Sequence, residues 1–478
     1  MKKKPVQRAR RGASAPPEAP ARVVVLAAGV GSRMRSSLPK VLHRVAGRTL
    51  VEAVLDAAAP LSPSRVVVVV GADRAKIVEV LDGRGLRFAV QDPPLGTGDA
   101  VARASEALGS GDGPVLVLAG DTPMLRPETL RRLVARRQAG NLDLVFLTFR
   151  PPEAGDFGRV VRNGRGKPTA IVEARNASAR QRKIAEVNAG VYCFDAAALG
   201  RALPKIRRNP VSGEYYLTDA VAVLAGGRGR VEAVEAEDWR EAWGVNTRRD
   251  LAAAEELERR RGVERALESG VSLLDPATVR IGPQVELAPD VVLHPFVCLE
   301  GKTVLSEGCE VLAFTRLLDT RLEAGASIGP HCDAEGAHVG PRAQVGPYSR
   351  LRPGAVLEED VRVGNFVEVK NTALRKGVKA LHLAYLGDAE VGAGANIGAG
   401  VITCNYDGEK KHRTTVGEGA FIGTDTQLVA PVTVGKGAYV GAGTTVTQDV
   451  PDGALALSRS PQVNKEGWAA RRKARKND

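Results

Sequence analysis

The chain has 478 residues and a formal net charge of +13; only 4% of its residues are aromatic, while 53 are glycine. A chain of this length is too long for one hydrophobic core, so we expect two domains with tails. No apolar run approaches the roughly 18 residues of a membrane-spanning helix, so no membrane segment is expected.

Most of the positive charge lies at the two ends of the chain. Residues 1–20 carry a net charge of +5 and residues 461–478 carry +4. The body between them is close to neutral, which does not favour specific nucleic-acid binding. Residues 1–21 are rich in proline and lack the apolar segment of a signal peptide, which predicts a disordered basic extension. The five cysteines show no C-x-x-C spacing, which is typical of thiols in a reducing cytoplasm.

The first ordered domain is predicted over residues 22–247. It opens with a continuous apolar run at 23–26, which is typical of a buried parallel strand. Further apolar runs at 65–70, 115–118 and 142–148 continue an α/β pattern, with helical stretches between them. Ligands of open α/β sheets bind at the carboxyl ends of the strands, so the loops that follow these runs are the candidate site.

A glycine-rich loop follows the first strand. Within residues 26–40 the chain reads L-A-A-G-V-G-S-R-M and then P-K. Gly29 and Gly31 allow backbone N–H groups to face a phosphate, and Arg33 and Lys40 can neutralise polyphosphate charge. A G-x-G after a strand could by itself be only a tight turn. The whole string resembles the signature of the sugar-1-phosphate nucleotidylyltransferases, which have a Rossmann-like domain, and this implies catalytic roles for Arg33 and Lys40.

A second loop, at residues 91–98, resembles the segment with which that family reads the nucleotide base, Q-x(4)-G-T-[GA]. The amide of Gln91 can pair with a pyrimidine edge, and Gly96 and Thr97 can donate hydrogen bonds. Asp99 stands where the family commonly has His.

Asp121 ends the segment A-G-D that follows a buried strand. A carboxylate together with substrate phosphates is the usual way in which proteins hold Mg²⁺, so we predict a metal ligand. The alternative is a helix N-cap. The resemblance implies that Asn246 is the second metal ligand.

Three short segments, at 157–160, 171–173 and 187–190, are similar to the family's sugar-binding segments, with Ala189 where the family often has Thr. The resemblance therefore implies a nucleotide and sugar site formed by Leu26, Ala27, Ala28, Gly29, Lys40, Gln91, Gly96, Thr97, Ala119, Gly120, Asp121, Gly158, Glu173, Asn188 and Asn246.

The second half begins with a stretch rich in Ala, Glu, Leu and Arg, which predicts a helical linker over residues 248–269. An aliphatic residue then returns every six positions, from 281 to 317, 339 to 369 and 416 to 446. A period of six fits neither an amphipathic helix nor an alternating strand, and it predicts a hexapeptide β-helix. The alternative, ordinary strands of a sandwich, is opposed by nineteen matching positions.

This register slips between Val369 and Val391 and between Ile397 and Val416, where the spacings are not multiples of six. Loops inserted into a solenoid often form its binding face, so we expect loops and the chemistry here. The two segments contain L-H-L-A-Y-L-G-D with His382, then N-I-G-A-G and C-N-Y-D-G. A single histidine among apolar residues is more often structural than catalytic, but the joint occurrence of the three motifs favours catalysis.

The motifs resemble the acetyltransferase half of the bacterial bifunctional UDP-N-acetylglucosamine pyrophosphorylase/glucosamine-1-phosphate N-acetyltransferases. The resemblance to this family as a whole covers about residues 22 to 468. The resemblance implies a left-handed, trimeric β-helix over 270–460, followed by a basic tail at 461–478. It implies His382 as general base, with Arg352, Lys370, Tyr385 and Asn396 on the amino sugar phosphate. The implied acetyl-CoA residues are Ala399, Asn405, Tyr406, Thr424, Ala442 and Arg459, with Thr424 in place of the usual Ser.

The resemblance therefore implies a cytoplasmic homotrimer that acetylates glucosamine 1-phosphate with acetyl-CoA. It would then transfer uridylyl from UTP to the product, with Mg²⁺ as cofactor. A nucleotidylyltransferase with a purely regulatory β-helix is the alternative, but it would lack the His382 motif. A non-enzymatic relative would have lost Arg33, Lys40 and Asp121, all of which are present. A galactosamine substrate is not excluded.

Overall fold

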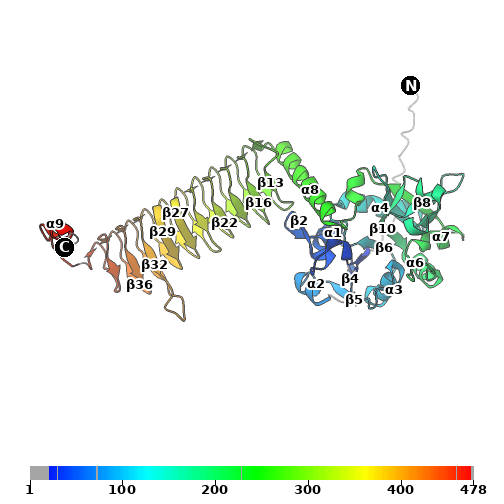
Figure 1. Cartoon of the computed structure of the whole chain (residues 1–478), viewed down its shortest axis with the longest axis horizontal. Coiled ribbons are helices and arrows are strands. Elements are labelled where there is room, and N and C mark those ends of the chain that lie inside the picture. The colour runs from blue at the N-terminus through cyan, green and yellow to red at the C-terminus, as the bar shows by residue number, and fades with distance from the viewer. Residues whose placement is uncertain (1–20, 30, 72–73, 228, 459, 475–478) are drawn as a thin grey trace, which may run out of the picture. The chain divides into compact units, whose positions relative to one another are not determined.

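The computed structural model describes residues 21–29, 31–71, 74–227, 229–458 and 460–474. Nearly all of the extension predicted at 1–21, and Arg459, therefore lie outside the described residues. The chain forms two compact units, Met1–Glu256 and Leu257–Asp478, and the boundary between them falls within helix α8 (Arg248–Glu268) (Figure 1). Among the described residues, no helix is both long and apolar enough to cross a bilayer.

The first unit is built on one mixed sheet. Its main path runs β11 (Val231–Glu235), β7 (Leu144–Phe149), β10 (Val187–Asp195), β6 (Pro114–Ala119), β1 (Arg22–Leu26), β4 (Arg65–Val70) and β5 (Arg87–Val90). Strands β5, β4, β1 and β6 are parallel, and the chain order changes direction between β1 and β6. A side hairpin, β8 (Arg159–Arg162) and β9 (Pro168–Val172), joins β10. The predicted α/β fold is confirmed.

Helices cover both faces of this sheet. Successive strand residues point to opposite faces and are apolar on both, so each face buries its side chains against helices. One face packs against α1 (Leu50–Ala58), α2 (Arg74–Val80) and α4 (Pro127–Gly140). The other packs against α3 (Thr97–Leu108), α6 (Ala196–Ala202) and α7 (Asp219–Ala225). A one-turn helix, α5 (Ala179–Arg182), follows the hairpin. Because both faces of the sheet are covered, the loops that carry the predicted site residues lie at its edge, where the parallel strands have their carboxyl ends.

The second unit is a parallel β-helix with three faces, followed by α9 (Trp468–Ala474) (Figure 1). The first face holds β12 (Ser272–Leu273), β15 (Val292–Leu293), β18 (Glu310–Val311), β21 (Ser327–Ile328), β24 (Gln344–Val345), β31 (Asn396–Ile397), β34 (Phe421–Ile422), β37 (Tyr439–Val440) and β39 (Leu455–Ala456). The second holds β13 (Arg280–Ile281), β16 (Cys298–Glu300), β19 (Arg316–Leu318), β22 (Asp333–Glu335), β25 (Arg350–Leu351), β32 (Ile402–Cys404), β35 (Gln427–Val429) and β38 (Thr445–Val446). The third holds β14 (Glu286–Leu287), β17 (Val304–Leu305), β20 (Arg321–Leu322), β23 (His338–Val339), β26 (Val356–Leu357), β28 (Ala373–Leu374), β30 (Ala389–Val391), β33 (Thr414–Val416) and β36 (Val432–Val434).

Two nine-residue strands, β27 (Arg362–Lys370) and β29 (Lys379–Gly387), bend around the corner between the first two faces and pair along their length. Gly364 sits at this corner, where a Cβ would lie 1.9 Å from the carbonyl oxygen of Leu381. Only glycine permits so close an approach of two coils.

The aliphatic residues of the six-residue period point into the β-helix. All nineteen are buried except Leu287, which packs against the same core. The prediction from the period is therefore confirmed. Small and aliphatic side chains suffice because each coil is narrow and stacks on similar neighbours.

The expectation of a loop between Val369 and Val391 is wrong. The inward positions continue through Leu374, Ala380 and Leu386, and the steps into Leu374 and Val391 are one residue short. The shortened corners place Asn371 and Asp388 in the left-handed region, at φ 44° and 48°. A corner residue with positive φ turns the chain in fewer residues, and Asn and Asp tolerate that conformation.

The second expected loop is present. After Cys404 the chain leaves the coil, makes an isolated antiparallel bridge between Tyr406 and Lys411, and returns at Thr414. This loop projects from the β-helix in Figure 1, and the Tyr406 residue is 61% exposed. Charged and polar residues at 407–413 explain why the segment stays outside the apolar core.

Candidate active sites

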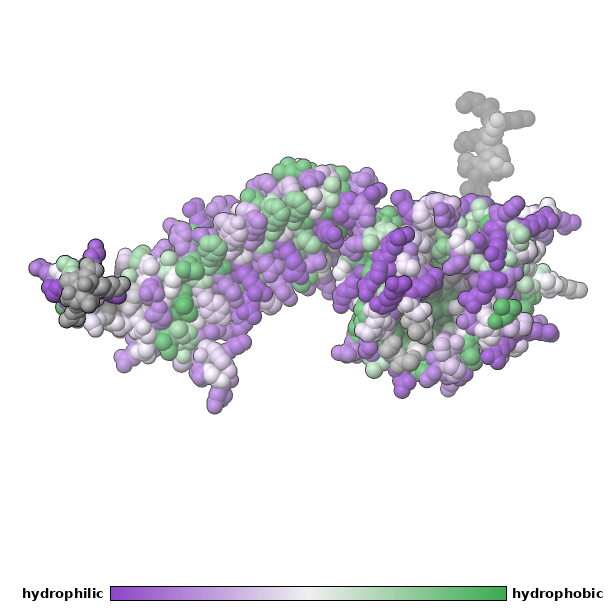
Figure 2. All heavy atoms as spheres, in the orientation of Figure 1, coloured by the Kyte–Doolittle hydropathy of each residue, from purple (hydrophilic) through white to green (hydrophobic). Residues whose placement is uncertain are grey.

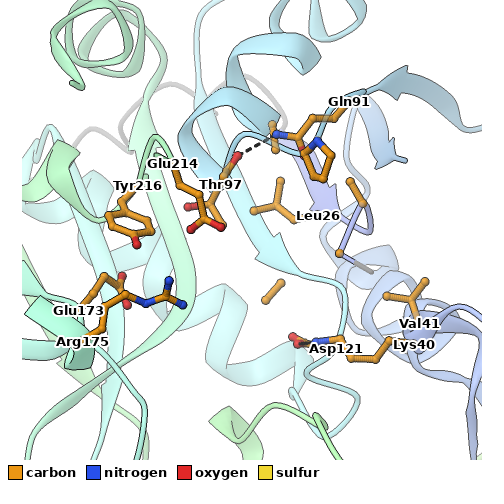
Figure 3. A pocket seen from close by; sticks show the side chains of 16 residues that line it. Leu26, Lys40, Val41, Gln91, Thr97, Asp121, Glu173, Arg175, Glu214 and Tyr216 are labelled. Carbon is orange, nitrogen blue, oxygen red and sulfur yellow. Dashed lines mark hydrogen bonds and ion pairs between the residues drawn. The ribbon is translucent and has the colours of Figure 1, made fainter. Parts of the chain in front are cut away.

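A cavity of 500 Å³ lies at the carboxyl ends of β1 and β6, where the strand order changes direction (Figure 3). Ten predicted residues line it: Leu26, Ala28, Gly29, Lys40, Gln91, Gly96, Thr97, Ala119, Asp121 and Glu173. Ala27, Gly120, Gly158, Asn188 and Asn246 do not line it directly. Val41, Pro94, Ala100, Arg175, Glu214 and Tyr216 also line it, and the sequence analysis did not assign them to the site.

One end of the cavity gathers cations and oxygen donors. Lys40 Nζ donates to Asp121 Oδ2 and, at 3.1 Å, to Asn246 Oδ1. Arg33 donates to the same Asn246 oxygen at 3.0 Å. The side-chain oxygens of Asp121 and Asn246 thus converge on one ammonium group, so the pair already binds a cation. Carboxylate and amide oxygens are also the hard ligands that Mg²⁺ prefers. Within the described ranges, no group of three His, Cys, Asp or Glu could hold a metal alone, so substrate phosphates would complete the coordination.

The opposite end is formed by the loop after β5. Gln91 is buried, and Figure 3 shows it in the wall of the cavity. Its Nε2 donates to the carbonyl oxygen of Gly96 and to Asp99 Oδ2, both at 2.8 Å. Thr97 Oγ1 accepts from the backbone N–H of Leu217 at 2.9 Å. Gly96 has φ 98°, and a Cβ there would lie 2.6 Å from the carbonyl oxygen of Tyr215. The segment 214–217 therefore fixes this loop.

A third wall carries the carboxyl group of Glu173. Burial raises the pKa of Glu173, although its hydrogen bond from Thr218 Oγ1 (3.0 Å) and the nearby charge of Arg175 act in the opposite direction. Asn188 lies behind this wall: its Nδ2 donates to Tyr192 Oη at 2.8 Å, and its Oδ1 accepts from the Gly190 N–H at 3.2 Å. Arg175 could not be found by motif, because nothing in the sequence indicates that it faces the cavity (Figure 3).

We expect Glu173→Gln to stabilise the first unit at neutral pH while it impairs sugar binding. With its pKa raised above the ordinary 4.5, the folded protein binds this proton more tightly than the unfolded chain does, so the ionised carboxylate lowers stability at high pH. The gain should be present at pH 7 and shrink as the pH falls toward 4.5. Thermal unfolding followed by the fluorescence of Trp239 and Trp243 tests it, with exposed Glu153→Gln as control. If the substitution shifted the unfolding temperature equally at pH 7 and near pH 4.5, the raised pKa of Glu173 would be contradicted.

The second group of predicted residues lies on β27 and β29. His382 pairs in register with Asn365, and its Nδ1 is 3.1 Å from Asn365 Oδ1. The amide oxygen accepts only, so this contact places the imidazole proton on Nδ1 and leaves the Nε2 lone pair available. Asn396 lies in β31, opposite Lys379. Sequence analysis did not assign Asn365, because its contact with His382 joins neighbouring coils.

The predicted phosphate cations are held by carboxylates. Arg352 pairs with Glu368 at 2.9 Å, and Lys370 faces Asp388 at 3.5 Å. Asp388 also accepts from Asn371 at 2.7 Å and from Asn405 at 2.5 Å. Burial opposes ionisation of Asp388, but these amide donors and the charge of Lys370 outweigh it and lower its pKa. Two further predicted residues, Asn405 and Tyr385, meet here, with Asn405 Nδ2 lying 3.5 Å from Tyr385 Oη.

Ala399, Thr424 and Ala442 occupy one row of corners on successive coils. Each follows an aliphatic-glycine pair, and the Asp425 N–H donates to the Ala399 carbonyl while Gly443 N–H donates to that of Thr424. A Cβ on Gly398 or Gly423 would lie within 2.7 Å of the backbone of the next coil. The coils are therefore closely stacked along this row, and the side chains on it are small. An extended ligand could lie along such a surface.

Known proteins match both units. A model of the MobA-like NTP transferase domain matches residues 23–191, and one of the bacterial transferase hexapeptide (six repeats) matches 413–448. A bifunctional protein GlmU of Thermus thermophilus is 51% identical over 94% of this chain and 98% of its own. Those of an Anaeromyxobacter species and of Streptomyces coelicolor are 50% and 48% identical, each over 95% of this chain and over 93% and 95% of their own. The chain belongs to the GlmU family.

Family membership extends over both units, because each of these matches spans nearly the whole chain. It supports the bifunctional interpretation over a single-activity nucleotidylyltransferase. The hexapeptide match and the three-faced parallel coil together agree with the left-handed class of β-helix, the exception to the usual right-handed crossover.

Proposed function

We propose that this GlmU-family chain makes UDP-N-acetylglucosamine in two steps. The β-helix acetylates glucosamine 1-phosphate with acetyl-CoA, and the first unit then transfers uridylyl from UTP to N-acetylglucosamine 1-phosphate. The observation that carries the proposal is the presence of two separate groups of reactive side chains, around His382 and around Lys40 and Asp121, in a chain of this family. Such a product supplies cell-wall precursor synthesis, and we place the enzyme in the cytoplasm.

In acetyl transfer, His382 Nε2 takes a proton from the sugar amine as the amine attacks the acetyl carbonyl. The bond between the carbonyl carbon and sulfur then breaks, CoA leaves as its thiolate, and the thiolate takes up that proton to become the free thiol. Asn365 keeps the proton on Nδ1 and so keeps Nε2 basic. Arg352 and Lys370 hold the sugar phosphate, and Tyr385 and Asn396 hold the sugar. The corner row of Ala399, Thr424 and Ala442 accommodates acetyl-CoA.

In uridylyl transfer, a phosphate oxygen of N-acetylglucosamine 1-phosphate attacks the α-phosphorus of UTP and pyrophosphate leaves. Arg33 and Lys40 stabilise the negative charge that develops on the leaving group. Asp121 and Asn246 would hold Mg²⁺, which neutralises phosphate charge when bound. Gln91 contacts the base and Glu173 contacts the sugar. No covalent intermediate is required.

We further propose that the working form is a homotrimer. A stack of partly exposed rings (Phe296, Phe314, His331, Tyr348 and Phe366) runs along the β-helix with centroids 4.7–5.6 Å apart, and apolar residues gather along that unit in Figure 2. A narrow coil with an exposed apolar edge and a projecting loop gains burial by packing against copies of itself.

We expect the projecting loop of one chain to complete the acetyl-transfer site of a neighbouring chain, so that each site is shared. Chains carrying His382→Ala, mixed and reassembled with chains carrying Tyr406→Ala, should then regain part of the acetyl transfer that each lacks alone. Tyr406 is chosen because it projects from the coil, whereas Asn405 already contacts Tyr385 of its own chain. Sedimentation velocity gives the assembly state. An active monomer, or mixtures no better than their components, would contradict a shared site.

The decisive experiment for the function supplies purified protein with UTP, Mg²⁺, acetyl-CoA and either glucosamine 1-phosphate or galactosamine 1-phosphate. Free thiol reports acetyl transfer and pyrophosphate reports uridylyl transfer. We expect thiol release to need only acetyl-CoA and the amino sugar phosphate, and pyrophosphate release to need N-acetylated sugar. Release of pyrophosphate without release of any thiol would instead favour a nucleotidylyltransferase whose β-helix is purely regulatory.

A further inference from the structure

The hydrogen bonds of Gln91 fix which end of its amide can face a ligand. Both N–H groups of Nε2 are used, one on the Gly96 carbonyl and one on the Asp99 carboxylate, each at 2.8 Å. Neither partner can donate, so the amide cannot be turned end for end without two acceptor–acceptor contacts. The oxygen Oε1 makes no hydrogen bond among the described residues, although the residue is only 3% exposed and lines the cavity. Gln91 therefore presents an acceptor.

Asp99 is the stronger of the two constraints. Its side chain is 14% exposed, and it is held on the other side by Arg103 Nε at 3.4 Å, one turn along α3. A hydrogen bond to a charged, partly buried acceptor is stronger than one to a neutral carbonyl. Asp99 also stands where the resembling family commonly has His.

From this we infer that Asp99 is a specificity-determining residue, which selects uracil over cytosine by locking Gln91 with Oε1 toward the base. Uracil carries an N–H donor at N3, which can pair with Oε1. Cytosine has an unprotonated acceptor at N3, which would face Oε1 with no proton between them. The inference rests on the proposed uridylyl transfer, because it identifies how the same cavity recognises the base.

The test compares kcat/KM for UTP and CTP in the full-length enzyme. In Asp99→Asn the new amide can either accept from or donate to Gln91, so the lock is weakened and only the Gly96 carbonyl still opposes rotation. The UTP:CTP ratio is expected to fall about tenfold to a hundredfold, as loss of one charged hydrogen bond implies. Part of that fall should be a gain in CTP use.

The matched control is Asp92→Asn, which removes the same charge from an exposed side chain next to Gln91 in the sequence. Its ratio should stay within about twofold of the wild type, since an exposed charge is well screened. Asp99→Ser, which removes the obligatory acceptor in a smaller side chain, is the second variant should Asp99→Asn fold poorly. The near-ultraviolet circular dichroism of Trp239 and Trp243 reports folding of the first unit.

The outcomes separate the inference from the function beneath it. A wild-type enzyme that does not use UTP would defeat the proposed function itself. A Gln91→Ala variant with an unchanged UTP:CTP ratio would remove Gln91, and Asp99 with it, from base recognition. If Gln91→Ala changes the ratio and folded Asp99→Asn matches Asp92→Asn, the role of Asp99 is wrong while uridylyl transfer stands.

Discussion

Replacing His382 by alanine is expected to lower kcat for acetyl transfer by about 10²- to 10⁴-fold, the range for loss of a general base. Uridylyl transfer in the same preparation should be unchanged, because the reactive side chains of that reaction lie in the other unit. Thiol release and pyrophosphate release measured in parallel give both numbers. KM for glucosamine 1-phosphate should change little, since Arg352 and Lys370 remain.

His338→Ala is the matched control, because His338 is a partly exposed histidine of the same β-helix that pairs with Glu323. It should leave both activities intact. A variant that loses both activities together would refute the division into two sites.

Replacing Asp121 by alanine is expected to lower uridylyl transfer by roughly a hundredfold or more, with acetyl transfer retained. The substitution removes a proposed metal ligand and also the partner of Lys40 in the cavity. Titration with Mg²⁺ gives a readout beyond loss of rate: Asp121→Asn should need a much higher concentration for half-maximal rate, because a neutral amide is the poorer ligand.

Asp156→Ala serves as the control for Asp121, since Asp156 lies 3.5 Å from Arg33 but its side chain is 92% exposed. Little change in rate or metal requirement is expected from it. If Asp121→Asn has the Mg²⁺ dependence of the wild type, Asp121 acts only through Lys40, and the metal ligands must be sought elsewhere.

Short-range pattern was sufficient for much of the architecture. The period of six determined which residues face the interior of the β-helix, because each coil repeats one steric environment and an aliphatic residue must fill it. The apolar runs at 23–26, 65–70 and 115–118 predicted three of the four parallel strands, β1, β4 and β6. The run at 142–148 became β7, which pairs antiparallel with β10, and β5 was not predicted by any run. The loops after those strands brought Lys40, Gln91 and Asp121 to one cavity, because parallel strands end at one edge of a sheet.

Tertiary structure decided what depends on contacts between distant segments. The register slip after Val369 is a pair of shortened corners and not a loop, since a residue with positive φ can replace a longer turn. The contacts that give the two sites their chemistry join distant residues. Asn365 contacts His382 on the neighbouring coil, and Lys40 contacts Asn246, which is 206 residues further along the chain. Arg175 and Asp99 carry no motif of their own. A periodic pattern reports the environment of each position, whereas a hydrogen bond between remote side chains exists only once the chain has closed around it.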